Sequence, residues 1–243
     1  FELLNCSLAY YNGLNNSSKN KFRFLHISTD EVYGSLGPTG KFKETTPYDP
    51  SSPYSASKAS SDHLVKSWFH TYSFPILVTN CSNNYGPYQF PEKLIPLMVL
   101  NSLEGKNLPV YGDGMQIRDW IHVRDHALGI LDTMEALATG EIRNGCVINF
   151  GADNEVPNIE IVRIIISLTG SSDESIEFVK DRPGHDKRYA MGFSKANKLL
   201  KWEPSVDWET GIFDTVEWYK NNSKWVNSVI SGEYRSWMKE HYD

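Results

Sequence analysis

Apolar residues recur along this chain with two different periods, and each period predicts a different kind of element. Runs rich in β-branched and aromatic residues that end at polar residues or glycine predict strands. The predicted strands lie at residues 22–27, 74–80, 108–111, 117–123, 146–150 and 176–179. Apolar positions three and four residues apart predict helices. The predicted helices lie at residues 1–11, 53–72, 91–103, 124–137, 158–168, 194–200 and 208–219, before an aromatic-rich tail at 225–242.

Local signals refine this pattern at three places. Residues 12–20 are polar and are expected to form a loop. Ser52 and Pro53 suit the cap and the first position of the helix at 53–72. Pro96 lies inside the predicted helix at 91–103 and is expected to kink it.

Strands alternate with helices over much of the chain, which is typical of an α/β fold. The strand at 22–27, the helix at 53–72 and the strand at 74–80 form a β-α-β unit, and both strands end in polar residues. Ligands in such sheets bind at the carboxyl ends of the strands. We therefore expect the chemistry to gather around Thr29, Asp30, Glu31, Tyr54, Lys58, Asn83 and Asn84.

The composition is that of a globular protein, with 40% hydrophobic and 22% charged residues in a chain of 243. The net charge of −6 and the scattered basic residues argue against nucleic acid as a partner. No apolar run approaches the ~18 residues of a membrane span, and no signal peptide is visible. Cys6, Cys81 and Cys146 lack metal spacing, so we expect no metal site, and buried free thiols in a reducing cytoplasm.

Tyr54 and Lys58 are four residues apart, so a helix places them on one face, one turn apart. A phenol with a pKa of about 10 is a weak base at neutral pH, but a nearby ammonium group lowers that pKa. The pair is therefore expected to act in proton transfer. An ordinary surface pair on an amphipathic helix is the alternative.

Asp30 and Glu31 follow the strand at 22–27 almost directly. Two neighbouring carboxyl groups can perform opposite proton transfers if their pKa values differ. We expect like-charge repulsion to raise the pKa of one of them. The alternative is a pair of solvated acids at the end of a strand.

Several motifs together resemble the extended short-chain dehydrogenase/reductase family and, within it, the dTDP-glucose 4,6-dehydratases. They are Ser-Thr-Asp-Glu-Val-Tyr-Gly at 28–34, Tyr-Ser-Ala-Ser-Lys at 54–58 and Asn-Cys-Ser-Asn-Asn-Tyr-Gly-Pro at 80–87. Further similarity at 90–96, 116–120, 181–186 and 208–219 extends the resemblance over essentially the whole chain. Epimerases of this family carry small or neutral residues at the positions of Asp30 and Glu31.

The resemblance implies an α/β fold with a partial NAD-binding Rossmann domain, part of a doubly wound parallel sheet, and a smaller α/β substrate-binding domain. The first would comprise residues 1–86 with 115–150, and the second residues 87–114 with 151–243. The implied activity is a lyase reaction that converts dTDP-glucose to dTDP-4-keto-6-deoxyglucose in deoxysugar (rhamnose) biosynthesis, with NAD as the cofactor. The resemblance also implies a cytoplasmic homodimer whose interface includes the helix at 53–72.

The resemblance assigns roles to individual residues. Tyr54 would be the base at the sugar 4-hydroxyl, supported by Lys58, and Thr29 would bind the 4-keto oxygen. Glu31 would be the base at C5, and Asp30 the acid that protonates the departing 6-hydroxyl. The implied cofactor-binding residues are Ser28, Tyr54, Lys58 and Asn84. The implied substrate-binding residues are Thr29, Asn83, Lys93, Leu94, Pro109, Tyr111, Arg118, Asn149, Arg182 and His185.

Family members carry a glycine-rich phosphate-binding turn well before the position where this chain starts. The stretch at 34–40 matches G-x-x-G-x-x-G, but Pro38 and the charged residues after it do not suit a phosphate site. This span alone is expected to bind NAD weakly and to be inactive if the turn is missing. Three interpretations stay open: the dehydratase, another sugar-nucleotide epimerase or dehydratase of the same fold, and a truncated non-catalytic fragment.

Overall fold

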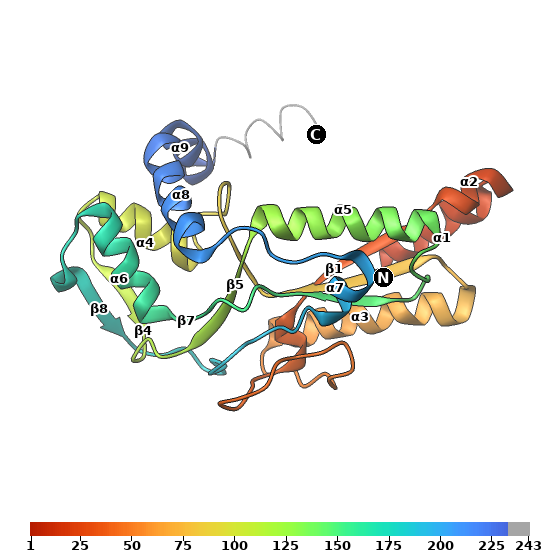
Figure 1. Ribbon diagram of the computed structural model, residues 1–243, viewed down its shortest axis with the longest axis horizontal. Coiled ribbons are helices and arrows are strands. Elements are labelled where there is room, and N and C mark those ends of the chain that lie inside the picture. The colour runs from red at the N-terminus through yellow and green to blue at the C-terminus, as the bar shows by residue number, and fades with distance from the viewer. Residues whose placement is uncertain (233–243) are drawn as a thin grey trace. The chain divides into compact units, whose positions relative to one another are not determined.

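The computed structural model describes residues 1–232, which form two compact units (Figure 1). Unit 1 comprises Phe1–Asn84, Arg118–Glu155 and Asp186–Ser205. Unit 2 comprises Tyr85–Ile117, Val156–His185 and the described residues from Val206 onward. Strands β3 (Asn83–Tyr85), β5 (Ile117–His122) and β7 (Glu155–Pro157) form one sheet, and each contains a point where the chain passes from one unit to the other.

A parallel sheet with the strand order β1-β2-β6 lies at the centre of unit 1. Its strands are β1 (Phe24–Thr29), β2 (Ile76–Cys81) and β6 (Val147–Phe150). Side chains alternate along β2, so that Ile76 and Val78 join one core cluster and Leu77 joins another. Helices α3 (Pro53–Tyr72) and α5 (Val123–Thr139) cover these two faces from opposite sides (Figure 1). The α/β class predicted from the sequence is confirmed, because a parallel sheet is covered on both faces.

Helix α3 has the predicted bounds, and local chemistry fixes both of its ends. Ser52 and Ser55 form a reciprocal capping box, with the Ser52 amide donating to Ser55 Oγ at 2.9 Å and the Ser55 amide to Ser52 Oγ at 3.1 Å. Ser73 ends the helix in the left-handed conformation with φ of 52°. The buried face carries Val65 and Trp68, which pack in the core cluster of β2.

Strand β1 runs directly into the short 3-10 helix η1 (Asp30–Tyr33), which ends at Gly34. Gly34 has φ of +83°, and a Cβ atom there would lie 2.4 Å from the Asp49 carbonyl oxygen. Glycine alone avoids both the strained conformation and this clash. The turn therefore fixes the direction of the chain immediately after the two acids.

Replacing Gly34 with alanine should lower the free energy of unfolding by about 2 kcal/mol or more, because the added methyl group meets backbone atoms in a strained conformation. Gly37 is the matched control, since a Cβ atom there has open space around it. Gly37→Ala should change stability by less than about 0.5 kcal/mol. Chemical denaturation of both variants measures the difference, and equal losses would contradict this account of the turn.

Unit 2 contains the parallel pair β4 (Leu108–Tyr111) and β8 (Ile176–Val179) with helices packed around it. Helix α4 (Leu94–Leu103) packs against α6 (Asn158–Thr169) and α8 (Trp208–Asn221), and α9 (Ser223–Ser231) follows. The Tyr219 hydroxyl donates a hydrogen bond of 2.6 Å to the Gln89 carbonyl oxygen. This bond ties α8 to the segment that precedes α4.

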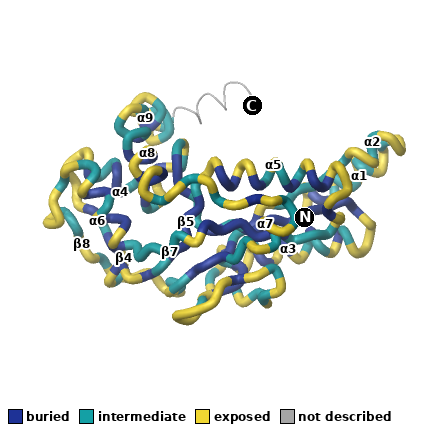
Figure 2. The backbone as a smooth tube through the Cα atoms, viewed as in Figure 1, coloured by how far each residue is buried: buried dark blue, intermediate teal, exposed yellow. Residues whose placement is uncertain are grey.

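Helix α5 covers the sheet with one face and exposes apolar residues on the other, so that buried and exposed positions alternate along it (Figure 2). Ala136 and Leu137 are buried in the core, whereas Leu128 and Leu131 are 43% and 63% exposed.

The structure divides the chain differently from the predicted domains at residues 151–155 and 186–205, which were expected in the substrate-binding domain and lie in unit 1. Helix α7 (Ser194–Leu200) and the residues after it bury Ala196 and Trp202 beside Phe150 of β6. Lys195 Nζ donates to the Val147 carbonyl oxygen at 2.6 Å. The spacing of apolar residues in a short helix does not reveal which hydrophobic core the helix joins. The sequence therefore could not place α7 in unit 1.

Several other expectations were wrong in detail. Residues 16–21 form a short helix, α2 (Asn16–Lys21), because Asn15 Oδ1 accepts from the Ser18 amide at 2.9 Å. Helix α4 begins at Leu94, not at 91, which places Pro96 in the first turn, where the missing amide proton costs no hydrogen bond and no kink is required. Cys6 is exposed, and Cys81 and Cys146 are half-buried free thiols.

Helix α1 (Glu2–Gly13) agrees with the amphipathic pattern at the start of the chain. The predicted aromatic-rich tail at 225–242 begins within α9, and its part from residue 233 onward lies outside the described residues. Within residues 1–232 no helix combines the length and the apolar character that a membrane span requires. The same residues contain no group of three or more His, Cys, Asp or Glu side chains arranged to hold a metal ion.

Candidate active site

The end of strand β1 places one buried and one half-buried carboxyl group next to each other. Thr29 Oγ1 accepts from the Glu31 amide at 3.3 Å and donates to Asp30 Oδ1 at 3.2 Å. Asp30 is 2% exposed, and its Oδ2 atom has no hydrogen-bond partner among the described residues. A buried carboxyl oxygen without a partner strongly disfavours the ionised form.

Burial raises the pKa of Asp30 from 3.8 to about 8, and the negative charges of Glu31 and Asp119 act in the same direction. The Thr29 hydroxyl and the Arg118 guanidinium oppose the rise. The expectation that the two acids would differ in pKa agrees with this value, but its stated cause was incomplete. Burial is the largest cause, and repulsion from Glu31 is the second.

The raised pKa of Asp30 makes stability depend on pH. Between pH 3.8 and about 8 the folded chain retains a proton at Asp30 that the unfolded chain releases, so stability falls as pH rises. Asp30→Asn removes this effect. The wild type should lose about 2 kcal/mol of unfolding free energy relative to Asp30→Asn when the pH is raised from 5 to 7. Urea denaturation at both pH values measures it, and a pH-independent difference would show that Asp30 is ionised in the folded protein.

Tyr54 and Lys58 lie on α3 with their functional groups accessible. Tyr54 is 55% exposed, and Lys58 Nζ donates to the Ile27 carbonyl oxygen at 3.0 Å. The surroundings provided by this chain raise the pKa of Tyr54, first through burial and then through Glu31, Cys81 and Asp30. The prediction that Lys58 lowers this pKa is therefore wrong for the described chain, because burial and then the nearby acids raise it, and the ammonium group is bonded to the strand.

The other predicted residues of unit 1 lie at the ends of the same strands, in different environments. Asn83 Oδ1 is buried without a hydrogen-bond partner among the described residues. Asn84 Oδ1 accepts from His126 Nδ1 at 2.9 Å, and Asn84 Nδ2 donates to the Ser82 carbonyl oxygen at 3.1 Å. Burial lowers the pKa of His126 to about 4, so this ring is neutral.

Ser28 is buried, and its hydroxyl donates to Asp62 Oδ2 at 2.9 Å. Its main chain lies in the β1–β2 ladder, and its carbonyl oxygen accepts from Cys81 Sγ at 3.6 Å. Asn149, predicted to bind substrate, is fully buried and accepts from the Tyr33 hydroxyl at 3.1 Å and from Asn80 Nδ2 at 3.2 Å. The structure therefore does not place Asn149 where a ligand could reach it directly. A polar residue at the end of a strand has the same sequence pattern whether its side chain is buried or accessible to a ligand, so the pattern could not show that Asn149 is buried.

Arg118 is 5% exposed and is held rigidly inside unit 1. Its guanidinium group lies 4.2 Å from the Tyr189 ring centroid and donates to the Asp186 carbonyl oxygen at 3.0 Å. The neighbouring Asp119 accepts hydrogen bonds from three backbone amides, and burial raises its pKa to about 6. The positive charge of Arg118 lowers the pKa of Asp30 and so opposes the effect of burial. Arg118 also stays a predicted phosphate contact.

Three of the predicted substrate residues gather in unit 2. Arg182 lies 5.9 Å from the Tyr111 ring centroid, and His185 lies 6.5 Å from it. His185 Nδ1 is 2.7 Å from Asp181 Oδ1, a hydrogen bond that lowers the pKa of Asp181. Tyr111 is half-exposed at the end of β4, so its ring is available for stacking.

The remaining predicted residues of unit 2 are Lys93, Leu94 and Pro109. Lys93 is exposed and lies 3.2 Å from Glu92, whereas Leu94 begins α4 and Pro109 is half-buried in β4. Each residue is therefore in or beside the element predicted for it.

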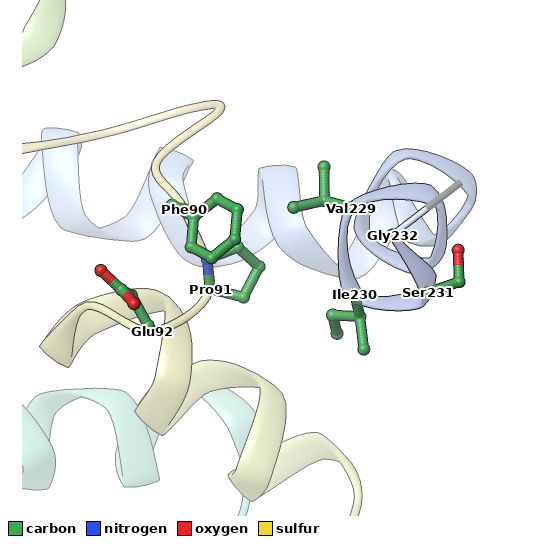
Figure 3. Close-up of a pocket in the computed structure, with 7 residues that line it drawn as sticks. All are labelled: Phe90, Pro91, Glu92, Val229, Ile230, Ser231 and Gly232. Carbon is green, nitrogen blue, oxygen red and sulfur yellow. The ribbon is translucent and has the colours of Figure 1, made fainter. Parts of the chain in front are cut away.

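Unit 2 also contains a cavity of about 330 Å³ that the sequence did not indicate. Figure 3 shows the segment before α4 facing residues of α9 across this cavity. Its lining residues are Phe90, Pro91, Glu92, Val229, Ile230, Ser231 and Gly232. It contains none of the predicted site residues, and its lining is largely apolar.

Comparison with known proteins gives consistent results. A model of the family described as GDP-mannose 4,6 dehydratase matches residues 1–215. The chain is 50% identical over 259 aligned positions to dTDP-glucose 4,6-dehydratase 1 of Escherichia coli K12, a match that covers 100% of this chain and 70% of that protein.

Two solved structures extend this similarity to the fold. A dTDP-glucose 4,6-dehydratase from Bacillus anthracis in complex with NAD is 50% identical, with a TM-score of 0.80 over 88% of this chain and 66% of that chain. A dTDP-glucose 4,6-dehydratase from Streptomyces venezuelae with NAD and TYD bound is 43% identical, with a TM-score of 0.80 over 85% of this chain and 62% of that chain. The chain thus spans about two thirds of the length of these solved structures. From its parallel sheet, its sequence motifs and these similarities, the chain belongs to the family of dTDP-glucose 4,6-dehydratases.

Proposed function

We propose that this protein catalyses the NAD-dependent dehydration of dTDP-glucose to dTDP-4-keto-6-deoxyglucose. The observation that carries this proposal is the pair formed by buried Asp30, with a pKa of about 8, and Glu31, both close enough to Tyr54 to raise its pKa. Elimination of water requires a proton donor for the leaving hydroxyl and a base for the adjacent carbon. An epimerase, which does not eliminate water, requires neither acid.

The residues at the end of β1 fit the nicotinamide end of NAD. Tyr54 and Lys58 offer accessible hydrogen-bonding groups, and Ile27, 44% exposed within β1, offers apolar surface beside them. Ser28, Tyr54, Lys58 and Asn84 would hold this end. When bound, NAD would supply the oxidation at C4 of the sugar and the later reduction at C6.

The glycine-rich stretch at 34–40 is no candidate for the pyrophosphate. It leads into α3 only after a further segment without a helix, so no helix N-terminus stands next to its glycines. The rejection of this stretch from the sequence agrees with that arrangement.

The side chains of this chain then divide the proton transfers. Tyr54 would accept the proton of the sugar 4-hydroxyl as the phenolate, a form that the positive charges of Lys58 and of bound NAD would favour. Thr29 Oγ1 hydrogen-bonds the oxygen as it becomes a ketone. The ketone makes the C5 proton acidic, and Glu31 removes it and would return a proton to C5 after C6 has been reduced. Asp30 gives its proton to the 6-hydroxyl, which leaves as water and carries away one oxygen and two hydrogens. Asp30 suits this step because it retains its proton at neutral pH.

The nucleotide end of the substrate is assigned to unit 2 and to Arg118. Arginine binds phosphate through a planar, bidentate fork, which suits Arg118 and Arg182, and Lys93 offers a point charge. Tyr111 would stack on the base. Leu94, Pro109, Asn83 and His185 complete the proposed substrate contacts.

Product analysis tests the proposal. The purified protein, incubated with dTDP-glucose and NAD, should form a product that absorbs in alkali and shows a C6 methyl signal by proton NMR. A product that retains its C6 hydroxyl would support an epimerase of the same fold, and no turnover under conditions in which an authentic dehydratase is active would support a non-catalytic module. Either result would contradict the proposed function.

A cytoplasmic homodimer is part of the same proposal. The exposed leucines of α5 and Tyr72 of α3, which is 52% exposed, supply apolar surface of the kind that helix-based interfaces bury. Sedimentation velocity should give the mass of a dimer, and a monomer at micromolar concentration would contradict this part of the proposal.

A further inference from the structure

Four titratable residues form one stripe along helix α3. Neighbours in the series Tyr54, Lys58, Asp62 and Lys66 are four residues apart, so each side chain lies one helical turn from the next. The first two take part in the proposed chemistry. The last two are used by no step of it, although Asp62 is fully buried and Lys66 is half-buried.

Asp62 accepts three hydrogen bonds from residues outside its own helix. Its Oδ1 atom lies 2.9 Å from His26 Nε2, and its Oδ2 atom accepts from the Ser28 hydroxyl at 2.9 Å and the Tyr48 hydroxyl at 2.8 Å. A carboxylate with no exposed surface is retained in a protein only when such donors compensate for its lost hydration. The three donors make this position a polar junction inside unit 1.

Lys66 supports the junction through Tyr48. Its Nζ atom donates to the Tyr48 hydroxyl at 3.1 Å and lies 4.5 Å from the centroid of the same ring. Burial lowers the pKa of Lys66, and the charge of Asp62 opposes that change. The ammonium group therefore orients Tyr48 toward the carboxylate.

The contacts of the stripe fall on three consecutive residues of β1. Asp62 bonds the side chains of His26 and Ser28, and Lys58 bonds the main-chain oxygen of Ile27 between them. Thr29, whose hydroxyl orients both acids, follows directly in the chain. Side chains of α3 thus bond β1 at residues 26–28, immediately before Thr29, Asp30 and Glu31 in the chain.

We propose that Asp62 is a positioning residue, whose buried carboxylate fixes the end of β1 against α3 through Ser28, His26 and Tyr48. It holds Thr29, Asp30 and Glu31 at a constant separation from Tyr54 and Lys58. Displacements of about 1 Å in a catalytic arrangement can cost about 100-fold in rate. The expected effect of Asp62 on kcat rests on the proposed function. Its expected effect on the position of the end of β1 does not.

Asp62→Asn tests the proposal with little change of volume. In the active protein it should lower kcat by about 10- to 100-fold and change KM by less than about threefold, because the substrate contacts are untouched. Asp125→Asn is the matched control. Asp125 is also a buried aspartate on a helix of unit 1, and it accepts from the Ser205 amide at 3.0 Å and hydroxyl at 2.6 Å. That variant should lose stability but keep the kcat of the wild type.

A double-mutant cycle shows whether Asp62 acts through the strand. Ser28→Ala should lower kcat in the wild-type background and should add less than about twofold in the Asp62→Asn background, because both changes break the same link. Independent, multiplying effects would show that Asp62 does not act through Ser28 and would overturn the proposal.

Hydrogen–deuterium exchange gives a readout that does not need activity. Asp62→Asn should speed amide exchange across residues 26–33 by about tenfold or more, and Asp125→Asn should leave it unchanged. Equal exchange in wild type and Asp62→Asn, or equal kcat in Asp62→Asn and Asp125→Asn, would overturn the positioning role. If the wild type lacks dehydratase activity the proposed function fails, and the exchange experiment still decides the role of Asp62.

Discussion

Replacing Tyr54 with phenylalanine should lower kcat for the dehydration by about 1,000-fold, with little change in KM. The phenol oxygen is the group that accepts the proton of the 4-hydroxyl, and a positioned general base contributes about 10²- to 10⁴-fold. Phenylalanine keeps the ring and its packing but has no atom for this transfer. Steady-state kinetics with dTDP-glucose measures the effect.

The control for this change lies on the same helix. Tyr72 is 52% exposed, close to the 55% of Tyr54, and it lies at the opposite end of α3. Tyr72→Phe should therefore keep at least half of the wild-type kcat. A Tyr54→Phe variant that loses less than about tenfold would remove Tyr54 from the role of general base.

The second large effect is expected for Asp30→Asn, which should lower kcat by about 100- to 1,000-fold. Asparagine has nearly the shape of the protonated acid, but it cannot release a proton to the departing 6-hydroxyl. Because the pKa of Asp30 is about 8, wild-type kcat should fall as pH rises through that value, when the acid loses its proton. The pH profile of kcat between pH 6 and pH 9 measures this limb.

The same profile separates Asp30 from other groups. Asp30→Asn should lose the limb near pH 8 in its residual activity, whereas Asp125→Asn should keep it. A wild-type rate that stays constant or rises through pH 8 to 9 would contradict the assignment of Asp30 as the acid.

The sequence was sufficient where local chemistry decides the structure. Helix α3 begins and ends where predicted, because the Ser52–Ser55 capping box and the spacing of apolar residues along the helix both depend only on residues close together in the sequence. The positions of Thr29, Asp30 and Glu31 at a strand end also follow from a local pattern. Their placement in unit 1 beside Tyr54 is thus a consequence of the β-α-β connection.

The sequence was insufficient where distant segments decide the environment. Asp30 has a raised pKa because it is buried and because Asp119 of β5, far along the chain, adds its charge. Asn149 and Ser28 face partners inside unit 1, and no sequence spacing reveals those partners. The junction at Asp62 was missed for the same reason, although its four-residue spacing from Lys58 was visible in the sequence.

The direction of the pKa shift of Tyr54 is a further instance. A lysine four residues away suggests a lowered pKa, but burial and then nearby acids raise the pKa of the phenol, and Lys58 Nζ is bonded to the Ile27 carbonyl oxygen. Spacing along a helix gives proximity but not the balance of charges around a group.

Solvent deuterium incorporation at C5 tests most directly whether Glu31 removes the C5 proton while Asp30 supplies the proton for water. In D2O the wild type should place deuterium at C5, and Asp30→Asn should retain that exchange at a slower overall turnover. Glu31→Gln should lose it by about 100-fold or more, because the amide cannot accept the proton. Undiminished deuterium incorporation in Glu31→Gln would contradict the division of roles between the two acids.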